Sequence, residues 1–221
     1  MPLIRNLWKT PSPQPPGRME GYTAVVGGSD SVPIALHLEG FETTGPAGVD
    51  LVFLIDNSGS MGWNDPHKHR FAAIKSMSQA FAPGRGDLDR IAIILFGGDD
   101  AVLAAPDDPW KQWSELPALV DTLGDPEGQT PFEKGMQLAT ELLAAQNGFY
   151  KLVVMLSDGY PVPDDAGYPQ TTIVKNQRVP EAHGSRVLYS TVYLRLPVPE
   201  NPEPIDNALL MYIASETDYV T

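Results

Sequence analysis

The sequence predicts an α/β protein with a mostly parallel central sheet, helices on both faces of the sheet and one antiparallel edge strand. Two segments, Val49–Ile55 and Ile91–Phe96, are almost continuously apolar, which is typical of parallel strands buried on both faces. Segments with helical spacing separate the strands, and this alternation favours a parallel sheet covered by helices. A short strand, Ala101–Ala104, follows the turn Gly97–Asp100, which is too short for a parallel crossover, so we expect it to run antiparallel.

The helices are predicted from apolar residues that recur with helical spacing. One series runs from Phe71 to Phe81, and Asp65 and Pro66 ahead of it suit the N-cap and first position of a helix. A second clear helical pattern covers Phe132–Ala145. The other predicted elements are a helix over Trp110–Leu123 that Pro117 is placed to break or kink, strands over Lys151–Leu156 and Val187–Leu194, a helix over Asn207–Ser215 and the start of a last strand at Tyr219-Val220.

Three regions of the chain differ in composition. Residues 1–20 are a proline-rich tail, in which we expect extended backbone and no core. Residues 21–45 contain two short strand-like segments, Tyr22–Val26 and Ile34–Glu39, and we expect them to form a β-hairpin extension that packs on the main domain. Residues 46–221 form that domain.

Charge and cysteine content exclude several classes of function. The 221 residues carry a formal net charge of -13 and include no cysteine. An acidic chain lacks the basic face that nucleic acid or an anionic membrane surface requires, so we expect neither as a partner. Without cysteine, no disulfide, zinc–thiolate site or thiol nucleophile is possible. We see no signal-peptide pattern and no membrane-spanning apolar run, and therefore expect a cytoplasmic protein, with secretion or surface exposure as the open alternative.

Oxygen-bearing side chains gather in the loops expected at one end of the sheet. Asp56, Ser58 and Ser60 occupy alternate positions directly after the first buried strand. Hard cations such as Mg²⁺ prefer an octahedral set of oxygen ligands, which three side chains do not complete. Thr130 precedes a predicted helix and Asp158 follows a predicted strand, and both should lie at the same end of the sheet. These five residues are therefore the predicted ligands of a divalent metal.

The ordered set of Asp-x-Ser-x-Ser, a threonine before a helix and Ser-Asp-Gly after a later strand resembles von Willebrand factor A domains. The resemblance covers the main domain and implies a three-layer, Rossmann-like fold with a metal-ion-dependent adhesion site. It implies that Ser58 and Ser60 bind Mg²⁺, Mn²⁺ or Ca²⁺ directly, and that Thr130 does so in a high-affinity state. Asp56 and Asp158 would act mostly through water. The open coordination position would take a carboxylate from a partner protein.

Each predicted ligand also has an ordinary structural explanation. Ser58 with Gly59 is a common turn sequence, and so is Asp158 followed by glycine. Thr130 and Glu133 fit the capping-box pattern, in which the threonine hydroxyl caps the following helix. The two roles of Thr130 compete for its hydroxyl, so capping would weaken when a cation is bound directly.

The loops around the predicted site carry aromatic and acidic side chains. Trp63 lies in the loop Asn57–Asp65 after the first buried strand, which we call the metal loop. There it either anchors a partner or packs against the predicted hairpin. The acidic residues serve solubility, or they form a negative rim that steers a basic partner. A partner carboxylate framed by Lys or Arg would reconcile the metal with this negative field. The predicted partner-binding residues are Trp63, Asp99, Asp100, Tyr160, Asp164 and Asp165.

The function predicted from these features is non-enzymatic protein binding that depends on a divalent metal, as one component of a larger assembly or in adhesion. The alternative is an accessory subunit or adaptor for an AAA+-type ATPase, as the resemblance to some bacterial A domains implies. A metal-dependent hydrolase is a third possibility. Against it, we find no nucleophile with an oriented base and no phosphate-binding loop, so we expect no catalytic residues.

Overall fold

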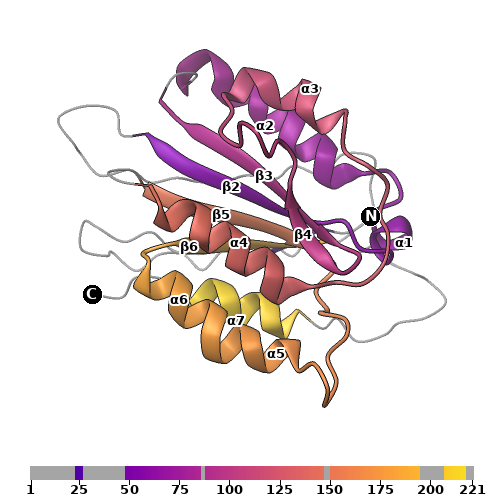
Figure 1. Cartoon of the computed structure of the whole chain (residues 1–221). Helices are drawn as coiled ribbons and strands as arrows, with labels where there is room; N and C mark the ends of the chain where they lie inside the picture. Colours follow the sequence, from indigo (N-terminus) through magenta and orange to yellow (C-terminus); the bar gives the residue numbers. More distant parts are fainter. Residues whose placement is uncertain (1–22, 27–47, 86–87, 147–149, 195–206, 218–221) are drawn as a thin grey trace.

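The computed structural model describes residues 23–26, 48–85, 88–146, 150–194 and 207–217 (Figure 1). The strands form one sheet in the order β1-β6-β5-β2-β3-β4. They are β1 (Thr23–Val26), β2 (Val49–Asp56), β3 (Arg90–Gly97), β4 (Asp100–Leu103), β5 (Tyr150–Ser157) and β6 (Leu188–Leu194). The helices are α1 (Met61–Asn64), α2 (His69–Arg85), η1 (Trp113–Glu115), α3 (Leu116–Val120), α4 (Phe132–Ala144), α5 (Gln170–Ile173), η2 (Val174–Arg178), α6 (Val179–Gly184) and α7 (Ala208–Glu216).

The sheet is parallel except at one edge. β2 pairs in parallel with β3 and β5, β5 with β6 and β6 with β1, whereas β4 pairs antiparallel with β3. The antiparallel register includes Phe96↔Ala101 and Gly97↔Asp100, so the chain reverses through a tight turn. The predicted fold class, including the antiparallel edge strand, is confirmed, and β4 begins one residue earlier than predicted.

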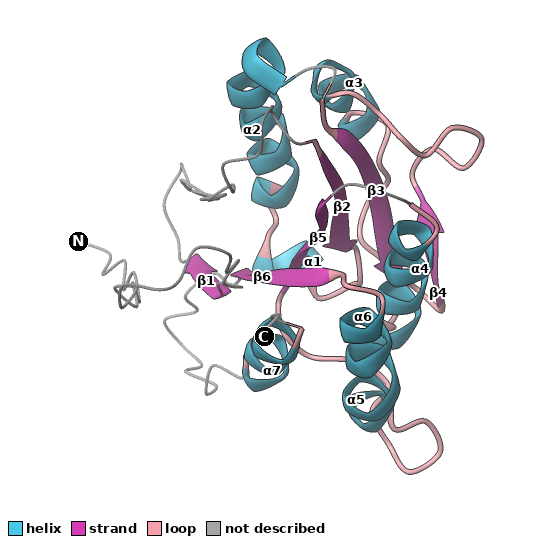
Figure 2. Cartoon of the chain, turned by 90° about the vertical axis from the view of Figure 1, so that its left-hand side faces the viewer, coloured by secondary structure: helices cyan, strands magenta, loops and turns pink. Residues whose placement is uncertain are grey.

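The central strand β2 explains why its sequence is continuously apolar. Every residue of β2 is buried, and its side chains alternate between two apolar layers. Val52 and Leu54 belong to the layer that α4 and α7 cover, while Phe53 and Ile55 belong to the layer that α2 and α3 cover. Figure 2 shows these helices on opposite faces of the sheet. Burial on both faces leaves no solvent side on which polar residues would be favoured.

The start of α2 differs from the prediction. The helix begins at His69 and not at Pro66, because Lys68 has a left-handed φ of 54° that a right-handed helix does not accommodate. Asp65 nevertheless serves the N-terminus of this helix. Its carboxylate accepts hydrogen bonds from the backbone N–H groups of His69 at 2.7 Å and Arg70 at 3.1 Å. The prediction that Asp65 is the N-cap residue is therefore wrong in position, although the carboxylate does satisfy free N–H groups of the helix.

Two other helical segments differ from the sequence prediction. The helix expected over Trp110–Leu123 is confined to η1 and α3, and Pro117 lies in the first turn of α3, where its missing N–H is tolerated. The helical segment from α5 to α6 was not predicted. Its buried residues Val174 and Val179 are five positions apart, whereas residues on one face of an α-helix recur every three or four positions. The wider spacing matches the π-helical turn η2, and it hides the helix from a search for α-helical spacing.

The N-terminal strand extends the sheet instead of covering a face. β1 lies beside β6, with Thr23↔Thr191 and Val26↔Leu194 in parallel register. The strand expected over Tyr22–Val26 is thus present as Thr23–Val26. The second predicted hairpin strand, Ile34–Glu39, lies outside the described residues, so the hairpin stays a prediction. The last strand expected at residues 219–220 lies outside them as well.

Candidate metal centre

The predicted ligands lie at the carboxyl ends of two neighbouring strands. Asp56 is the last residue of β2, and Asp158 directly follows Ser157, the last residue of β5. The two strands pair in parallel through Ile55↔Leu156, so their ends meet at one edge of the sheet. The side chain of Ser157 bridges them, because its Oγ donates a hydrogen bond to Asp56 Oδ2 at 2.6 Å. Sequence reasoning did not single out Ser157, although it belongs to the recognised Ser-Asp-Gly run.

Asp56 is a buried carboxylate that receives only uncharged hydrogen-bond donors. Its Oδ1 accepts from the backbone N–H of Ser58 at 2.9 Å and from Ser58 Oγ at 2.6 Å. Burial, together with the nearby charge of Asp158, raises the pKa of Asp56 to about 7, against the opposing effect of the hydrogen bonds from Ser157 and Ser58. The shift indicates that two negative charges share this site without a basic side chain between them.

The two serine hydroxyls of the loop lie side by side. Ser58 Oγ is 3.1 Å from Ser60 Oγ. Because the Ser58 hydroxyl donates its proton to Asp56, Ser60 must be the donor in this pair. Asp56 and Ser58 are buried, whereas Ser60 and Asp158 are partly exposed. The cluster is therefore closed on the side of the sheet and open to solvent on the side of Ser60 and Asp158.

Thr130 lies between the two loops that carry the other predicted ligands. The backbone N–H of Gly59 donates to the carbonyl of Gly128 at 3.0 Å, which attaches the metal loop to the segment just before Thr130. Thr130 in turn forms an antiparallel bridge with Val162, with N–H···O distances of 2.9 and 3.2 Å. The capping-box alternative is wrong, because the N-cap of α4 is Pro131, without a side-chain hydrogen bond, and Glu133 contacts other partners.

A close glycine contact holds this arrangement together. Gly128 has a φ of 66°, and a Cβ atom there would lie 2.4 Å from the Cα of Gly98. The β3–β4 turn and the loop before Thr130 thus touch backbone to backbone, and the contact is extended by hydrogen bonds from Gly98 N to Glu127 O and from Gln129 N to Gly98 O. Only glycine combines the left-handed backbone with this approach.

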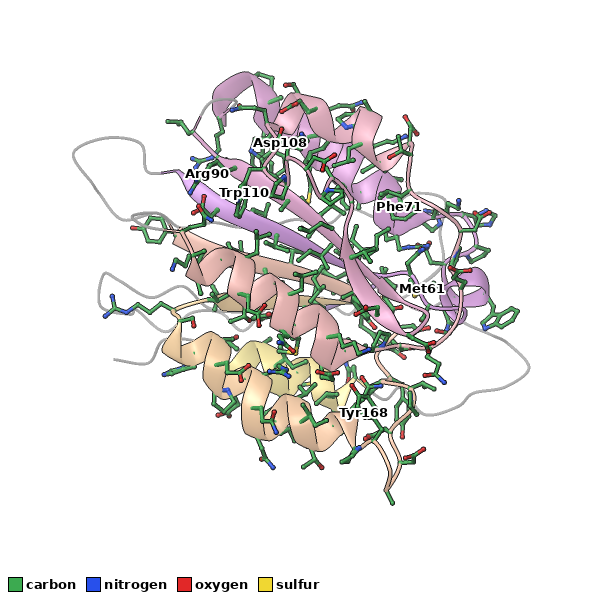
Figure 3. The ribbon with its side chains drawn as sticks, in the orientation of Figure 1. Met61, Phe71, Arg90, Asp108, Trp110 and Tyr168 are labelled. Atoms are coloured by element: carbon green, nitrogen blue, oxygen red, sulfur yellow. The ribbon has the colours of Figure 1, made fainter. Side chains whose placement is uncertain are left out.

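Asn64, at the end of α1, contacts the predicted ligand Asp158. Its Nδ2 donates a hydrogen bond to Asp158 Oδ2 at 2.9 Å. The side chain of Met61, at the start of α1, is fully buried and anchors this short helix to the core (Met61 is labelled in Figure 3). Sequence reasoning missed Asn64, because nothing in the spacing of residues 64 and 158 shows that they meet.

A buried ion pair supports the metal loop from behind. Arg70 is fully buried, and its guanidinium donates to Asp65 Oδ2 at 2.8 Å and to Asn57 Oδ1 at 2.9 Å. Asn57 is the residue between Asp56 and Ser58, and its Nδ2 donates to the carbonyl of Asp125 at 3.1 Å. Asn57 thus links the metal loop to the buried Arg70 and to the backbone of Asp125, and these hydrogen bonds limit the movement of the loop. This network was not predicted either.

The predicted partner-binding residues fall into two groups. Trp63 and Tyr160 are exposed, at 75% and 54%, and Asp99 and Asp100 are exposed at the β3–β4 turn. Asp164 and Asp165 are exposed as well, but their carboxylates also organise their own loop. Asp164 accepts from the backbone and hydroxyl of Thr171, and Asp165 accepts from the backbone N–H groups of Gly167 and Tyr168.

A cavity of about 570 Å³ lies beside α4 and η2, and none of the predicted metal ligands lines it. Glu133 in its wall accepts hydrogen bonds from the Tyr168 hydroxyl and from Arg178 (Tyr168 is labelled in Figure 3). Burial and the contact with Glu133 together raise the pKa of Tyr168 to about 12. The polar groups of this wall are thus largely occupied by one another.

The donor set suits a hard divalent cation. The five residues offer two carboxylates and three hydroxyls, all of them oxygen donors, which Mg²⁺, Mn²⁺ and Ca²⁺ prefer. In the described part of the chain, no group of three or more His, Cys, Asp or Glu side chains is placed to hold a metal, so a centre here depends on the hydroxyls. Among the described residues, the hydrogen bonds to the buried Asp56 carboxylate come from Ser58 and Ser157, which are uncharged, and a cation would supply the positive charge.

Part of the chain matches a known family of domains. Residues 51–160 match the family model of the von Willebrand factor type A domain. The fold is similar to proximal thread matrix protein 1 from the mussel byssus, with 18% identity, a TM-score of 0.51 and coverage of 76% of this chain and 40% of that one. It is also similar to an aerotolerance-related membrane protein from Bacteroides fragilis, with 17% identity, a TM-score of 0.52 and coverage of 78% and 88%.

Another structure of the mussel protein is described with zinc in its metal-ion-dependent adhesion site (MIDAS) motif. It has 17% identity and a TM-score of 0.52, over 76% of this chain and 39% of that one. The chain thus spans well under half of the mussel protein. No curated protein sequence matches the chain. In the described ranges, no helix has the length and apolar content needed to cross a membrane.

Proposed function

We propose that the von Willebrand factor type A domain of this chain is a protein-binding module that depends on a divalent cation and acts without catalysis, as part of a larger assembly. The observation that carries the proposal is the cluster at the ends of β2 and β5. There, the buried Asp56, the adjacent hydroxyls of Ser58 and Ser60, and Asp158 form an oxygen-lined site that is open to solvent on one side. The zinc-occupied motif of the structurally similar mussel protein supports metal binding at such a site.

The residues of the chain would share the work of holding Mg²⁺. Ser58 and Ser60 would bind it through their hydroxyl oxygens and Thr130 would join them, while Asp56 and Asp158 would act mostly through water. Asp56 orients Ser58, because it accepts a hydrogen bond from the Ser58 hydroxyl at 2.6 Å, so the oxygen lone pairs of Ser58 point away from Asp56 and are available to Ser60 or to a cation. When bound, the cation supplies positive charge and an open coordination position that a carboxylate of a partner protein can fill.

The acidic surroundings favour a particular kind of partner. Asp99 and Asp100 are exposed at the β3–β4 turn, which is hydrogen-bonded to the loop before Thr130. The chain as a whole carries a net charge of -13. A partner that presents its carboxylate with lysine or arginine nearby would gain attraction from the protein field and from the cation together.

Capture from a lysate of the source cells, with Mg²⁺ or with EDTA, tests the proposal. The immobilised chain should retain a defined protein in Mg²⁺ and lose it in EDTA or after Ser58→Ala. Ser114→Ala, at an exposed serine of η1, is the matched control and should retain the same protein. Substitution of acidic residues in the captured protein should then abolish binding. Retention of the same protein in EDTA, or ATP turnover by the purified chain in Mg²⁺, would contradict the proposal.

A further inference from the structure

Large apolar side chains are exposed around the candidate metal centre. Among the described residues, five such side chains are exposed. Three of them lie in the segments that directly follow the predicted ligands or pair with them: Trp63 in α1 at 75%, and Tyr160 at 54% and Val162 at 42% in the loop after β5. The other two, Val102 in β4 and Met211 in α7, lie on separate elements. Exposed apolar side chains that gather around a functional site indicate a binding surface more strongly than isolated ones do.

The backbone connections place these three residues beside the predicted ligands. Trp63 is followed by Asn64, whose side chain is hydrogen-bonded to Asp158 at 2.9 Å. Tyr160 comes two residues after Asp158 in the chain. Val162 forms the antiparallel bridge with Thr130. The three residues therefore belong to the segments that carry the predicted ligands or their hydrogen-bond partners.

The fold keeps Trp63 out of the core. Met61 and Trp63 are two positions apart in α1, and residues with this spacing point to nearly opposite sides of a helix. Met61 is fully buried in the core layer under α2, so the orientation of α1 directs Trp63 outward. An exposed tryptophan held on an anchored helix loses little conformational entropy when a partner covers it, which favours its use as a binding anchor.

We propose that the partner segment presents its carboxylate together with a nearby aromatic or aliphatic side chain, which Trp63, Tyr160 and Val162 receive. The proposal rests on the metal-dependent binding proposed above and specifies the partner further. Trp63 lies three residues after Ser60, and Tyr160 two residues after Asp158, so each anchor lies within about 11 Å of a predicted ligand along the backbone. The apolar residue of the partner should therefore lie within about three residues of its acidic residue.

Selection from a random library of short linear peptides on the immobilised full chain tests this inference. The selection is made in Mg²⁺ and in EDTA with the wild-type chain, and in Mg²⁺ with Ser58→Ala and with the double variant Trp63→Ser/Tyr160→Ser. The double variant Val102→Ser/Met211→Ser is the matched control, because it removes two apolar side chains of similar exposure that lie outside the loops carrying the predicted ligands. Thermal unfolding checks that every variant is folded.

The wild-type chain in Mg²⁺ should enrich peptides in which an apolar residue lies within about three residues of an acidic residue. The Trp63→Ser/Tyr160→Ser variant should keep the acidic preference, lose the apolar preference and bind the enriched peptides at least about tenfold more weakly. The Val102→Ser/Met211→Ser control should behave as wild type. Acidic peptides without an apolar neighbour, or an apolar preference that survives Trp63→Ser/Tyr160→Ser, would overturn this inference alone. Absence of any acidic enrichment that depends on Mg²⁺ and Ser58 would overturn the proposed function and this inference with it.

Discussion

Asn64 and Asp158 are joined by a hydrogen bond of 2.9 Å from Asn64 Nδ2 to Asp158 Oδ2, although 94 positions separate them in the chain. The bond ties α1 to the loop after β5 and occupies one of the two carboxylate oxygens of Asp158. In the proposed centre, the other oxygen would be available to a water molecule bound to the cation. Asn64 thus positions a predicted ligand without being one, in the manner of groups that orient metal ligands from behind.

Removal of the Asn64 side chain should weaken metal binding more than it weakens the fold. Asn64→Ala is expected to raise the Kd for Mg²⁺ about tenfold, because Asp158 loses the donor that orients it. Calorimetric titration with Mg²⁺ measures the change, and the melting temperature in EDTA should shift little, because Asn64 is not fully buried. An unchanged Kd would show that Asp158 needs no orientation from α1.

Mg²⁺ should stabilise the folded chain, and Asp158 should be required for this effect. A ligand that binds only the folded state adds about 2.7 kcal/mol at roughly a hundredfold excess over Kd. We expect a clear rise in melting temperature with millimolar Mg²⁺ or Mn²⁺, and none in Asp158→Ala. Asp107→Ala, at an exposed aspartate, is the control and should respond as wild type. If neither Mg²⁺ nor Mn²⁺ changes the melting temperature of the wild-type chain, the result would count against the metal centre.

The buried charge of Asp56 should make the metal-free domain less stable as the pH rises. Its pKa in the folded chain is raised to about 7, above the ordinary value of 3.8, so the folded state binds a proton more readily than the unfolded state does. The contribution of this group is favourable at low pH and is lost as the pH rises from about 4 through 7. In EDTA, Asp56→Asn should therefore show a shallower decline in unfolding free energy over this range than wild type. Equal slopes in the two proteins would contradict this, and Mg²⁺ should rescue only wild type at pH 8.

Gly128 should tolerate no side chain. In Gly128→Ala, the left-handed backbone alone costs about 1–2 kcal/mol, and the new Cβ would lie 2.4 Å from the Cα of Gly98, so the loop before Thr130 must move. We expect both a lower unfolding free energy and weaker Mg²⁺ binding. Gly62→Ala is the matched control, because a Cβ there meets nothing within 4 Å. Denaturant unfolding and Mg²⁺ titration of both variants check the prediction, and equal behaviour of the two would refute it.

Features that depend on neighbouring residues can be predicted from the amino-acid sequence alone. The apolar run of β2 predicts a strand buried on both faces, and the short turn before β4 permits only an antiparallel strand. The convergence of Asp56, Ser58 and Ser60 also follows from local spacing, because a tight loop brings alternate side chains together. Their hydroxyl and carboxylate contacts bear out that convergence, while their role as metal ligands stays a prediction.

Tertiary structure decided what depends on residues that meet from distant parts of the chain. β1 pairs with β6 at the sheet edge, and no pattern in a four-residue strand specifies its partner. The π-helical turn of η2 breaks the spacing that would have revealed the helix around it. The contacts of Asn64 with Asp158 and of Arg70 with Asn57 have the same origin, because a side chain finds its hydrogen-bond partner only after the sheet has brought the loops together.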